Sequence, residues 1–430
     1  MKICVLGLGY VGLPTAVVFA HRGLNVIGVD IDENKVELIN KGKSYISEPE
    51  LPEMLKKVVS QGLLSATSDG IEAVKRCDIV IVAVPTPSTK KSVDLSALKS
   101  ALETIKEGLH REQLIVIEST IPPGTTVNLA KPFLEETGLY AEKDFYLAHV
   151  PERIAPGYAI KELLNAPRIV GGIGHKSTKK ALEVYGKVNP NLLPTDATTA
   201  EFVKLIENTF RDLNIAYANF LALVAEKLGI DVDEAIRLAN THPRVNIHRP
   251  GAGVGGPCLT KDPYMLLQLS EDVFGAELID IARKINEYMP KHTIAIILRA
   301  LRGNNVPISK AKLAIFGAAY KGGIDDTRES PTKSIVSKLL NMTKDVVVYD
   351  PYTTESFGAQ RANSIEDAIR EADALVIVTD HPEFKQLDLK NLKKLMRHPI
   401  IVDGRRIIDP KNALKLGFKY YGIGFAKGEQ

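Results

Sequence analysis

A glycine-rich turn near the N-terminus constrains the fold of this chain most strongly. Gly7, Gly9 and Gly12 form a G-x-G-x-x-G motif that follows a short apolar run, residues 2–6, and opens a helical pattern. Asp30 ends the next apolar run, 18 residues after Gly12. Strand, glycine turn, helix, strand and acidic residue in this order are typical of a dinucleotide-binding βαβ unit. The motif therefore predicts an N-terminal α/β domain that holds a pyrophosphate at the start of its first helix.

The cofactor that this motif favours is NAD. The carboxylate of Asp30 would accept hydrogen bonds from the adenosine ribose and repel a 2′-phosphate, and no arginine follows it. Thr86 and Thr120 follow later strands that point to the same crevice, where they either contact the cofactor or water or cap their turns. A wound domain without any cofactor is the alternative. The predicted cofactor contacts are Gly7, Gly9, Tyr10, Val11, Gly12, Asp30, Lys35, Thr86 and Thr120.

Strand-like and helical segments alternate along both halves of the chain. This order predicts an α/β fold of two Rossmann-like, doubly wound parallel sheets joined by a helical middle. Two internal echoes support the second sheet: NVIGVDID resembles VVVYDPY, and RCDIVIVAVPTP resembles EADALVIVTDHP. The predicted strands are 2–6, 25–30, 78–84, 114–119 and 145–149, then 312–317, 345–350, 374–379 and 400–403. The predicted domains are 1–195, 196–303 and 311–430, with a linker over 302–310.

The middle region contains a long segment without glycine or proline. Thr198 and Glu201 have the spacing of a capping box, and Gly229 is a plausible stop, which predicts one long central helix. Lys204, Asn208 and Arg211 lie at i, i+4 and i+7 and share one face of this helix. They either form a solvated face or line a cavity for an anionic or alkoxide-bearing substrate.

The most unusual stretch is a glycine-rich loop that ends in a cysteine. Four glycines, residues 251–256, precede Cys258, which lies close to Lys261 and Asp262. A nearby positive charge favours a thiolate, so Cys258 is either a nucleophile or a packed thiol. Cys4 and Cys77 lie in or beside apolar strands and are interpreted as inert.

The composition excludes several classes of protein. With 55 Lys and Arg against 52 Asp and Glu, the net charge of +3 argues against a nucleic-acid partner. No apolar run is long enough for a membrane span, and no secretory leader is recognisable. Three widely spaced cysteines form neither a disulfide framework nor a metal site, so we expect no metal and a cytoplasmic location.

Seven motifs together resemble the UDP-sugar 6-dehydrogenases over essentially the whole chain. They are GLGYVGLP (7–14), STIPPGT (119–125), PER (151–153), EFVKLIENTFRDLNIAYANF (201–220), GGPCLTKDP (255–263), AYKGGIDDTRESP (319–331) and DGRR (403–406). The resemblance implies oxidation of a primary alcohol to a carboxylate with two NAD, and a homodimer formed by the helical middle. It also implies that the C-terminal wound domain holds UDP.

The resemblance assigns a role to each candidate catalytic residue. Cys258 matches the nucleophile that forms a thiohemiacetal and then a thioester. Lys204 and Asn208 match the pair that stabilises the developing oxyanion. Asp262 and Thr120 match residues that position a water, and Glu152 matches the glutamate of thioester hydrolysis. Arg328 matches a cofactor contact.

The substrate implied by the resemblance is a UDP-N-acetylhexosamine, especially UDP-N-acetyl-D-mannosamine. The segment VPERIAPG departs from the NPEFLxEG pattern of the UDP-glucose branch, although Pro257 stands where the N-acetylhexosamine branch usually has histidine. His242 and Arg244 are expected to contact the substrate, and either they reach across the dimer or His242 caps a helix. The implied substrate contacts are Arg153, Ile154, Lys204, Asn208, Arg211, His242, Arg244, Gly255, Tyr320, Lys321 and Arg405.

Several alternatives stay open at this point. UDP-N-acetylglucosamine or UDP-glucose are the alternative substrates within the resemblance. A two-electron hydroxyacid dehydrogenase would not need Cys258, and it would leave the C-terminal wound domain unexplained. A non-catalytic NAD-binding scaffold is the most remote alternative, because both Cys258 and Lys204 are present.

Overall fold

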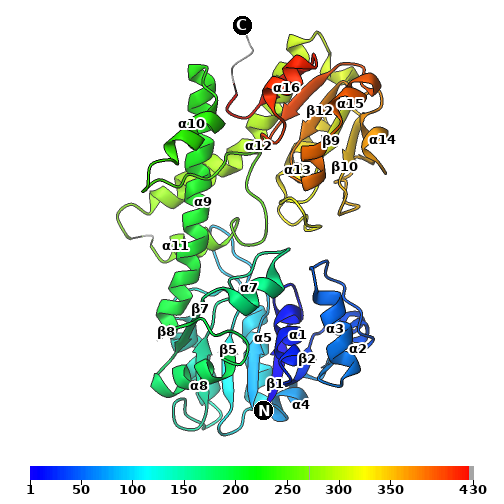
Figure 1. The fold of residues 1–430 in the computed structure, drawn as a ribbon. Coiled ribbons are helices and arrows are strands. Elements are labelled where there is room, and N and C mark those ends of the chain that lie inside the picture. Colours follow the sequence, from blue (N-terminus) through cyan, green and yellow to red (C-terminus); the bar gives the residue numbers. More distant parts are fainter. Residues whose placement is uncertain (271, 426–430) are drawn as a thin grey trace. The chain divides into compact units, whose positions relative to one another are not determined.

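The computed structural model describes residues 1–270 and 272–425, which fall into two compact units. Unit 1 comprises Met1–Glu207 and Tyr264–Leu269, and unit 2 comprises Asn208–Pro263 and the chain from Ser270 onward. Each unit contains one wound sheet with helices on its faces (Figure 1). The predicted α/β class is confirmed. The domain boundaries stay a prediction, and residues 426–430 of the predicted third domain lie outside the described residues.

The sheet of unit 1 has eight strands in the order β3-β2-β1-β4-β5-β6-β7-β8. Its strand order reverses between β1 and β4, the switch point where wound sheets bind ligands. Neighbouring strands are parallel except β6 and β7, which pair antiparallel and depart from the predicted all-parallel sheet. The strands are β1 Lys2–Leu6, β2 Asn25–Val29, β3 Leu64–Thr67, β4 Ile79–Val82, β5 Leu114–Ile117, β6 Tyr146–His149, β7 Arg168–Gly172 and β8 Leu192–Asp196.

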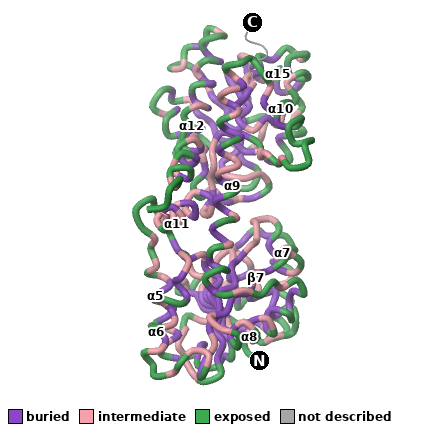
Figure 2. Tube along the Cα trace, turned by 90° about the vertical axis from the view of Figure 1, so that its left-hand side faces the viewer, coloured by how far each residue is buried: buried purple, intermediate pink, exposed green. Residues whose placement is uncertain are grey.

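Both faces of this sheet are covered. Ile3 and Val5 of β1 pack into one apolar core, and the alternating Cys4 and Leu6 pack into another. Burial on both faces explains why the central strands are continuous apolar runs (Figure 2). The covering helices are α1 Gly12–His21, α2 Glu33–Asn40, α3 Leu51–Ser60, α4 Gly70–Lys75, α5 Ser96–Gly108, the π-helical turn Thr126–Ala130, α6 Lys131–Glu135, α7 Ala159–Asn165 and α8 His175–Tyr185.

The sheet of unit 2 repeats the order of the first six strands of unit 1. Its order is β11-β10-β9-β12-β13-β14, all parallel, which confirms the internal echo in the sequence. Its strands are β9 Leu313–Phe316, β10 Val346–Tyr349, β11 Gln360–Arg361, β12 Ala374–Ile377, β13 Ile400–Asp403 and β14 Lys419–Gly422. Its helices are α13 Pro331–Leu339, α14 Ile365–Ile369, α15 Leu389–Leu395, α16 Pro410–Lys415 and the 3₁₀ turns Ile308–Lys310 and Pro382–Gln386.

Four helices form the middle of the chain, and the predicted long helix is confirmed. They are α9 Ala197–Leu228, α10 Val232–Ala239, α11 Asp262–Gln268 and α12 Glu277–Gly303. The helix α9 belongs to unit 1 as far as Glu207 and to unit 2 from Asn208. The helix α12 ends at Gly303, so the first two residues of the predicted linker, 302 and 303, belong to the helix. No described helix combines the length and apolar composition needed to cross a membrane.

The predicted capping box of α9 is wrong. The carboxylate of Asp196 caps the helix, because it accepts from the backbone N–H of Thr199 at 2.9 Å and from its hydroxyl at 2.6 Å. Glu201 is fully buried and instead accepts from the N–H groups of Gly124 and Thr126. The first turn of α9 is therefore attached to the loop that follows β5.

Candidate active site

The glycine turn between β1 and α1 has the geometry that a dinucleotide requires. Gly7 has a φ of +90°, and its N–H donates to the Val29 carbonyl at 2.8 Å. A Cβ on Gly12 would lie 1.8 Å from the Gly7 carbonyl oxygen, so only glycine lets α1 approach this closely. A Cβ on Gly9 would meet no atom within 4 Å, which leaves open space beside the backbone for a pyrophosphate.

Asp30 directly follows β2 and is held in place by the turn. Its Oδ2 accepts from the N–H of Leu8 at 2.9 Å, and Lys35 Nζ lies 3.3 Å from the same oxygen. The hydroxyl of Tyr45 donates to the Leu8 carbonyl. Burial is the main cause that raises the pKa of Tyr45, and the negative charge of Asp30 raises it further. Tyr45 escaped the sequence analysis because it lies outside the motif. The residues present fit the adenosine half of NAD, with a fixed carboxylate as ribose acceptor.

The two predicted threonines lie together at adjacent strand ends. The Thr86 hydroxyl donates to the Thr120 carbonyl at 2.6 Å, and the Ser119 hydroxyl donates to the Val84 carbonyl at 2.8 Å. These contacts join the loops that follow β4 and β5, which are neighbours in the sheet. The joined loops face the switch point, where a nicotinamide cofactor would lie.

A cluster of charged residues surrounds the start of α9 in unit 1. Lys204 is 6% exposed, and its Nζ lies 3.6 Å from Glu152 Oε2. The other oxygen of Glu152 accepts from the N–H of Ile154. Arg153 forms a two-pronged ion pair with Glu207, at 2.6 Å and 3.2 Å. The structure thus brings together the predicted residues of the PER motif and Lys204. The structure adds Glu207 to this cluster. Its position three residues after Lys204 on the same helix was a signal available from the sequence.

His149 is a second member of this cluster that the sequence analysis missed. It is fully buried at the end of β6, and neither ring nitrogen has a hydrogen-bond partner among the described residues. Burial and then the charge of Lys204 lower the pKa of His149 to about 3, so the ring is neutral at physiological pH. The sequence did contain a signal for His149, because a polar residue ends an apolar strand two residues before Pro151.

Asn208 and Asp262 form the core of a second group, in unit 2. The Asn208 amide donates to Asp262 Oδ2 at 2.6 Å, and Lys261 Nζ lies 2.9 Å from Asp262 Oδ1. Asn208 is 4% exposed, so the predicted alternative of a solvated helix face is wrong for it and for Lys204. Arg211 is exposed, so the predicted alternative of a solvated helix face is correct for this residue.

Cys258 is partly exposed in a turn that leads into α11. Its carbonyl accepts from the N–H groups of Lys261 at 3.0 Å and Asp262 at 2.9 Å. By contrast, Cys4 and Cys77 are buried, and burial raises the pKa of Cys77 to about 11. These two are packed thiols, as predicted.

The glycines before Cys258 permit a close approach of another loop. A Cβ on Gly255 or Gly256 would lie 2.7 Å from the side chain of Tyr320. The N–H of Gly256 donates to the Arg328 carbonyl at 3.1 Å. The predicted residues Gly255, Tyr320 and Arg328 therefore lie around the cysteine loop.

A buried ion pair fixes the other side of this loop. Arg283 of α12 donates to Asp212 at 2.8 Å and to the Leu259 carbonyl at 3.1 Å. Both side chains are almost completely buried. The sequence analysis missed them, although charged residues inside apolar helices are a usable signal.

The remaining predicted residues of unit 2 occupy three places. The Arg328 side chain donates three hydrogen bonds to the Asp326 carboxylate, at 2.9 Å, 3.1 Å and 2.6 Å. Arg405 donates to Asp380 at 3.1 Å. His242 and Arg244 lie in an exposed turn after α10, where Asn240 forms the C-cap. The predicted alternative that His242 caps this helix is wrong.

The glycine turn, the acidic end of β2 and the switch point define a dinucleotide-binding protein, and unit 2 adds a second wound sheet and the cysteine loop. Comparison with known proteins gives the same result. The UDP-glucose/GDP-mannose dehydrogenase family matches with its NAD-binding domain over residues 1–189, its central domain over 198–288 and its UDP-binding domain over 314–410. The chain belongs to this family, and its cofactor is NAD.

Individual relatives match the chain over almost its full length. UDP-N-acetyl-D-mannosamine dehydrogenase of Pyrococcus horikoshii is 48% identical and covers 99% of both chains. The solved structure of the Pyrococcus horikoshii enzyme has a TM-score of 0.93, covering 99% of this chain and 100% of that one. The UDP-glucose dehydrogenase of Pyrobaculum islandicum is 29% identical, with a TM-score of 0.88, covering 99% and 98%.

Proposed function

We propose that this protein oxidises the 6-hydroxyl of UDP-N-acetyl-D-mannosamine to the uronate. The observation that carries the proposal is the 48% identity, over 99% of both chains, with a relative named for this substrate. The net reaction consumes one alcohol, two NAD⁺ and one water, and yields one carboxylate, two NADH and three protons. UDP-N-acetylglucosamine and UDP-glucose are the alternative substrates.

The first oxidation needs a group that stabilises an alkoxide. The Lys204 ammonium and the Asn208 amide supply one charged and one neutral donor, one helical turn apart on α9. Asp262 and Thr120 would hold the water that takes up the proton. Bound NAD supplies the hydride acceptor.

The second oxidation explains the cysteine. The Cys258 thiolate adds to the aldehyde carbon and forms a thiohemiacetal, whose oxidation gives a thioester. Water then cleaves the carbon–sulfur bond, which releases the acid and returns the thiol. Glu152, held by the backbone N–H of Ile154, would guide that water.

The other site residues would recognise the substrate and complete the cofactor site. Arginine and lysine side chains suit a pyrophosphate, and three of the arginines are paired with acidic residues: Arg153 with Glu207, Arg328 with Asp326 and Arg405 with Asp380. Arg328 is the proposed cofactor contact from unit 2. The proposed substrate contacts are Arg153, Ile154, Arg211, His242, Arg244, Gly255, Tyr320, Lys321 and Arg405.

The substrate proposal is tested by measuring NADH formation with three UDP-sugars. We expect about two NADH per UDP-N-acetyl-D-mannosamine consumed. UDP-N-acetylglucosamine and UDP-glucose should give kcat/KM values lower by a factor of about 10² or more. Activity confined to UDP-glucose would overturn the substrate assignment, and one NADH per sugar would overturn the four-electron reaction.

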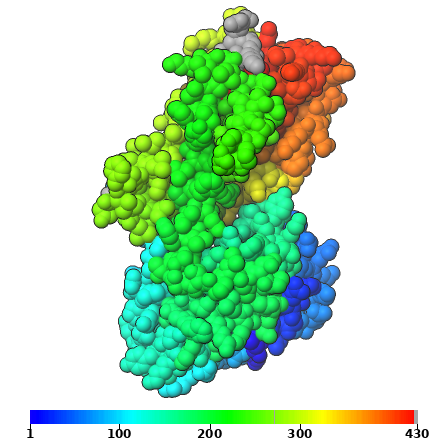
Figure 3. Space-filling model, turned by 60° about the vertical axis from the view of Figure 1, so that its left-hand side comes forward, coloured from blue at the N-terminus to red at the C-terminus, as the bar shows by residue number. Residues whose placement is uncertain are grey.

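We also propose that the protein is a homodimer formed through α9. Five large apolar side chains of this helix are 42–57% exposed. They recur at intervals of four, four, seven and three residues, so they form one stripe along the helix. The stripe consists of Phe202, Ile206, Phe210, Tyr217 and Phe220. Atoms of α9, drawn in green, lie at the surface in Figure 3. An exposed apolar stripe of this length favours a second copy of the same helix as its partner.

Charge placed in the stripe should separate the dimer. Phe210 is 57% exposed, so Phe210→Glu removes apolar contact area and buries a carboxylate in the proposed interface. We expect a dimer for the natural chain and a monomer for this variant in multi-angle light scattering. Phe210→Leu, which keeps an apolar side chain at the same position, is the matched control and should stay dimeric. A monomeric natural chain would contradict the proposal.

Two further assignments complete the proposal. The NAD-binding domain would span residues 1–195, the dimerisation region 196–303 and the UDP-sugar-binding domain 311–430. The three cysteines are free thiols, which supports work in the reducing cytoplasm.

A further inference from the structure

Unit 2 contains a second copy of the glycine turn. Gly317 has a φ of +100°, and its N–H donates to the Tyr349 carbonyl at 2.8 Å, as Gly7 donates to Val29. Asp350 directly follows β10, as Asp30 follows β2. Its Oδ2 accepts from the N–H groups of Ala318 at 2.7 Å and Ala319 at 3.0 Å.

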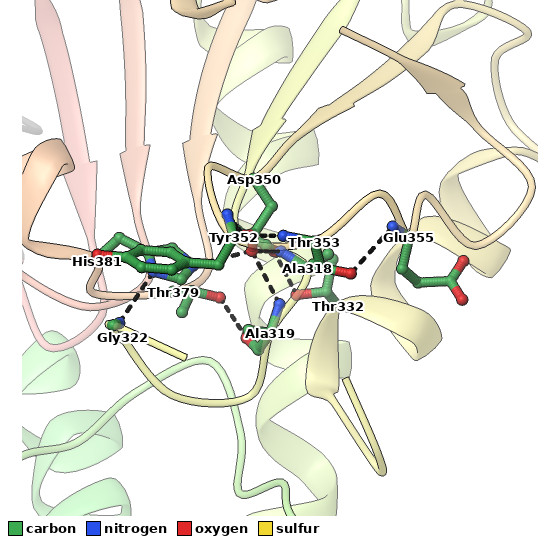
Figure 4. A network of polar contacts seen from close by, with 12 residues as sticks. Ala318, Ala319, Gly322, Thr332, Asp350, Tyr352, Thr353, Glu355, Thr379 and His381 are labelled. Carbon is green, nitrogen blue, oxygen red and sulfur yellow. Dashed lines mark hydrogen bonds and ion pairs between the residues drawn. The ribbon is translucent and has the colours of Figure 1, made fainter. Parts of the chain in front are cut away.

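The two turns differ in what else contacts the acidic residue. In unit 2, His381 Nε2 lies 2.8 Å from Asp350 Oδ2, and both side chains are fully buried (Figure 4). The ring of Tyr352 stacks on His381 with centroids 4.9 Å apart, and Phe384 meets it edge-on at 5.2 Å. The imidazole therefore completes the burial of this carboxylate, whereas the Asp30 side chain of unit 1 is 8% exposed and contacts Lys35.

The hydrogen bonds indicate the tautomer of His381. The N–H of Gly323 donates to Nδ1 at 3.1 Å, so Nδ1 carries a lone pair. The single proton then resides on Nε2 and is donated to Asp350. Burial raises the pKa of Asp350, but the interaction with His381 and the hydrogen bonds from the N–H groups of Ala319 and Tyr352 together outweigh it, and the net shift is downward. A neutral imidazole thus links an ionised carboxylate to the backbone of the loop 320–323.

The preceding residue holds the same loop and a predicted substrate contact. Asp380 Oδ1 accepts from the N–H of Gly322 at 3.3 Å and from Arg405 Nη2 at 3.1 Å. The hydroxyl of Thr379 donates to the Ala319 carbonyl at 2.6 Å. Residues 379–381, which follow β12, therefore all form hydrogen bonds with the segment that contains Tyr320 and Lys321.

We propose that His381 is a positioning residue for UDP-sugar binding. It holds Gly323, and with it Lys321, in the conformation that receives the substrate, while Asp380 fixes Arg405. This inference rests on the proposed function, because Lys321 and Arg405 are the proposed substrate contacts. Holding such side chains in place before binding saves the cost of ordering them on binding, so its loss should appear in the KM for the UDP-sugar.

Two substitutions separate the two hydrogen bonds of His381. The Oδ1 of His381→Asn occupies the place of Nδ1 and still accepts from Gly323. The Nε2 of His381→Gln still donates to Asp350 but leaves Gly323 without its acceptor. We expect His381→Gln to raise the KM for UDP-N-acetyl-D-mannosamine about tenfold, with little change in kcat or in the KM for NAD. His381→Asn should stay within about threefold of the natural protein.

A control and a second variant keep the test decisive. Tyr352→Phe removes the hydrogen bond to Glu383 at 2.8 Å and keeps the stacked ring, so it should behave like the natural protein. If His381→Gln fails to fold, Asp380→Ala replaces it. The Asp380 side chain is one-third exposed, so this variant should fold, and it should show the same selective rise in the KM for the UDP-sugar. Equal effects of His381→Asn and His381→Gln, or a parallel rise in the KM for NAD, would overturn the positioning role.

Calorimetric titration with UDP separates this inference from the proposed function. His381→Gln should weaken UDP binding about tenfold, and His381→Asn should not. A natural protein that binds UDP but oxidises no UDP-hexosamine would refute the proposed function alone. Unchanged UDP affinity of His381→Gln in an active enzyme would refute the positioning role alone.

Discussion

Cys258→Ala is expected to lower uronate formation by a factor of about 10³ or more while NAD binding stays unchanged. The variant lacks the sulfur that would retain the aldehyde carbon, so no thioester forms and the second oxidation has no substrate. Cys258 lies in unit 2, whereas the glycine turn and Asp30 lie in unit 1, so the NAD affinity should be that of the natural protein. Product analysis by mass spectrometry and NADH titration by fluorescence measure the two effects separately.

Cys77→Ala is the matched control for this experiment. Cys77 is a buried thiol whose pKa burial raises to about 11, so it stays protonated and unreactive at neutral pH. The control should retain full turnover. Iodoacetamide should label the natural protein once, and Cys258→Ala not at all. Unchanged acid formation by Cys258→Ala would refute the covalent route, because the four-electron oxidation would then proceed without a thioester.

Lys204→Met is expected to reduce kcat by a factor of about 10²–10³. Lys204 is nearly completely buried, and methionine keeps its length but removes the charge that stabilises the alkoxide. Steady-state kinetics should show the loss in kcat, with the KM for NAD close to that of the natural protein. Lys227→Met, on the exposed end of the same helix, should leave every constant unchanged.

A double variant distinguishes catalysis from stability. Lys204→Met alone leaves Glu152 buried without its ion-pair partner, which destabilises the fold. Lys204→Met combined with Glu152→Gln removes both charges, so thermal unfolding should recover toward the natural value, while kcat should stay well below that of Glu152→Gln alone. Recovery of kcat together with stability would show that Lys204 acts only as a structural partner.

The sequence predicted nine strands of the two sheets and missed the four edge strands and β7, which lies beside the edge strand β8. Central strands such as β1 and β9 are buried on both faces and stand out as apolar runs. The edge strands β3, β8, β11 and β14 are short and partly exposed, and β8 contains Pro194. The capping error has a different origin, because the Thr198–Glu201 spacing was right but tertiary contacts recruited Glu201 to the loop after β5.

The candidate site was predictable where chemistry demands a particular residue type. Cys258, Lys204 and Asn208 carried their own signals, since a cysteine in a glycine loop and polar side chains inside an apolar helix are unusual. Glu207, His149 and Arg283 each carried a weaker signal, but which residues they meet was not predictable, because their contacts join segments distant in sequence. Pairing of that kind depends on the tertiary structure, which spacing along the chain does not encode.

An aspartate follows the second strand of each glycine turn, but the two aspartates have different roles. A change at Asp30 would affect the binding of NAD, because its carboxylate is the expected acceptor for the ribose hydroxyls. A change at Asp350 would first affect the protein interior, because His381 already occupies its carboxylate. A motif search that scores only the backbone pattern would report two ribose sites here. Duplicated domains therefore require the partner of the acidic residue to be identified before a nucleotide is assigned to each copy.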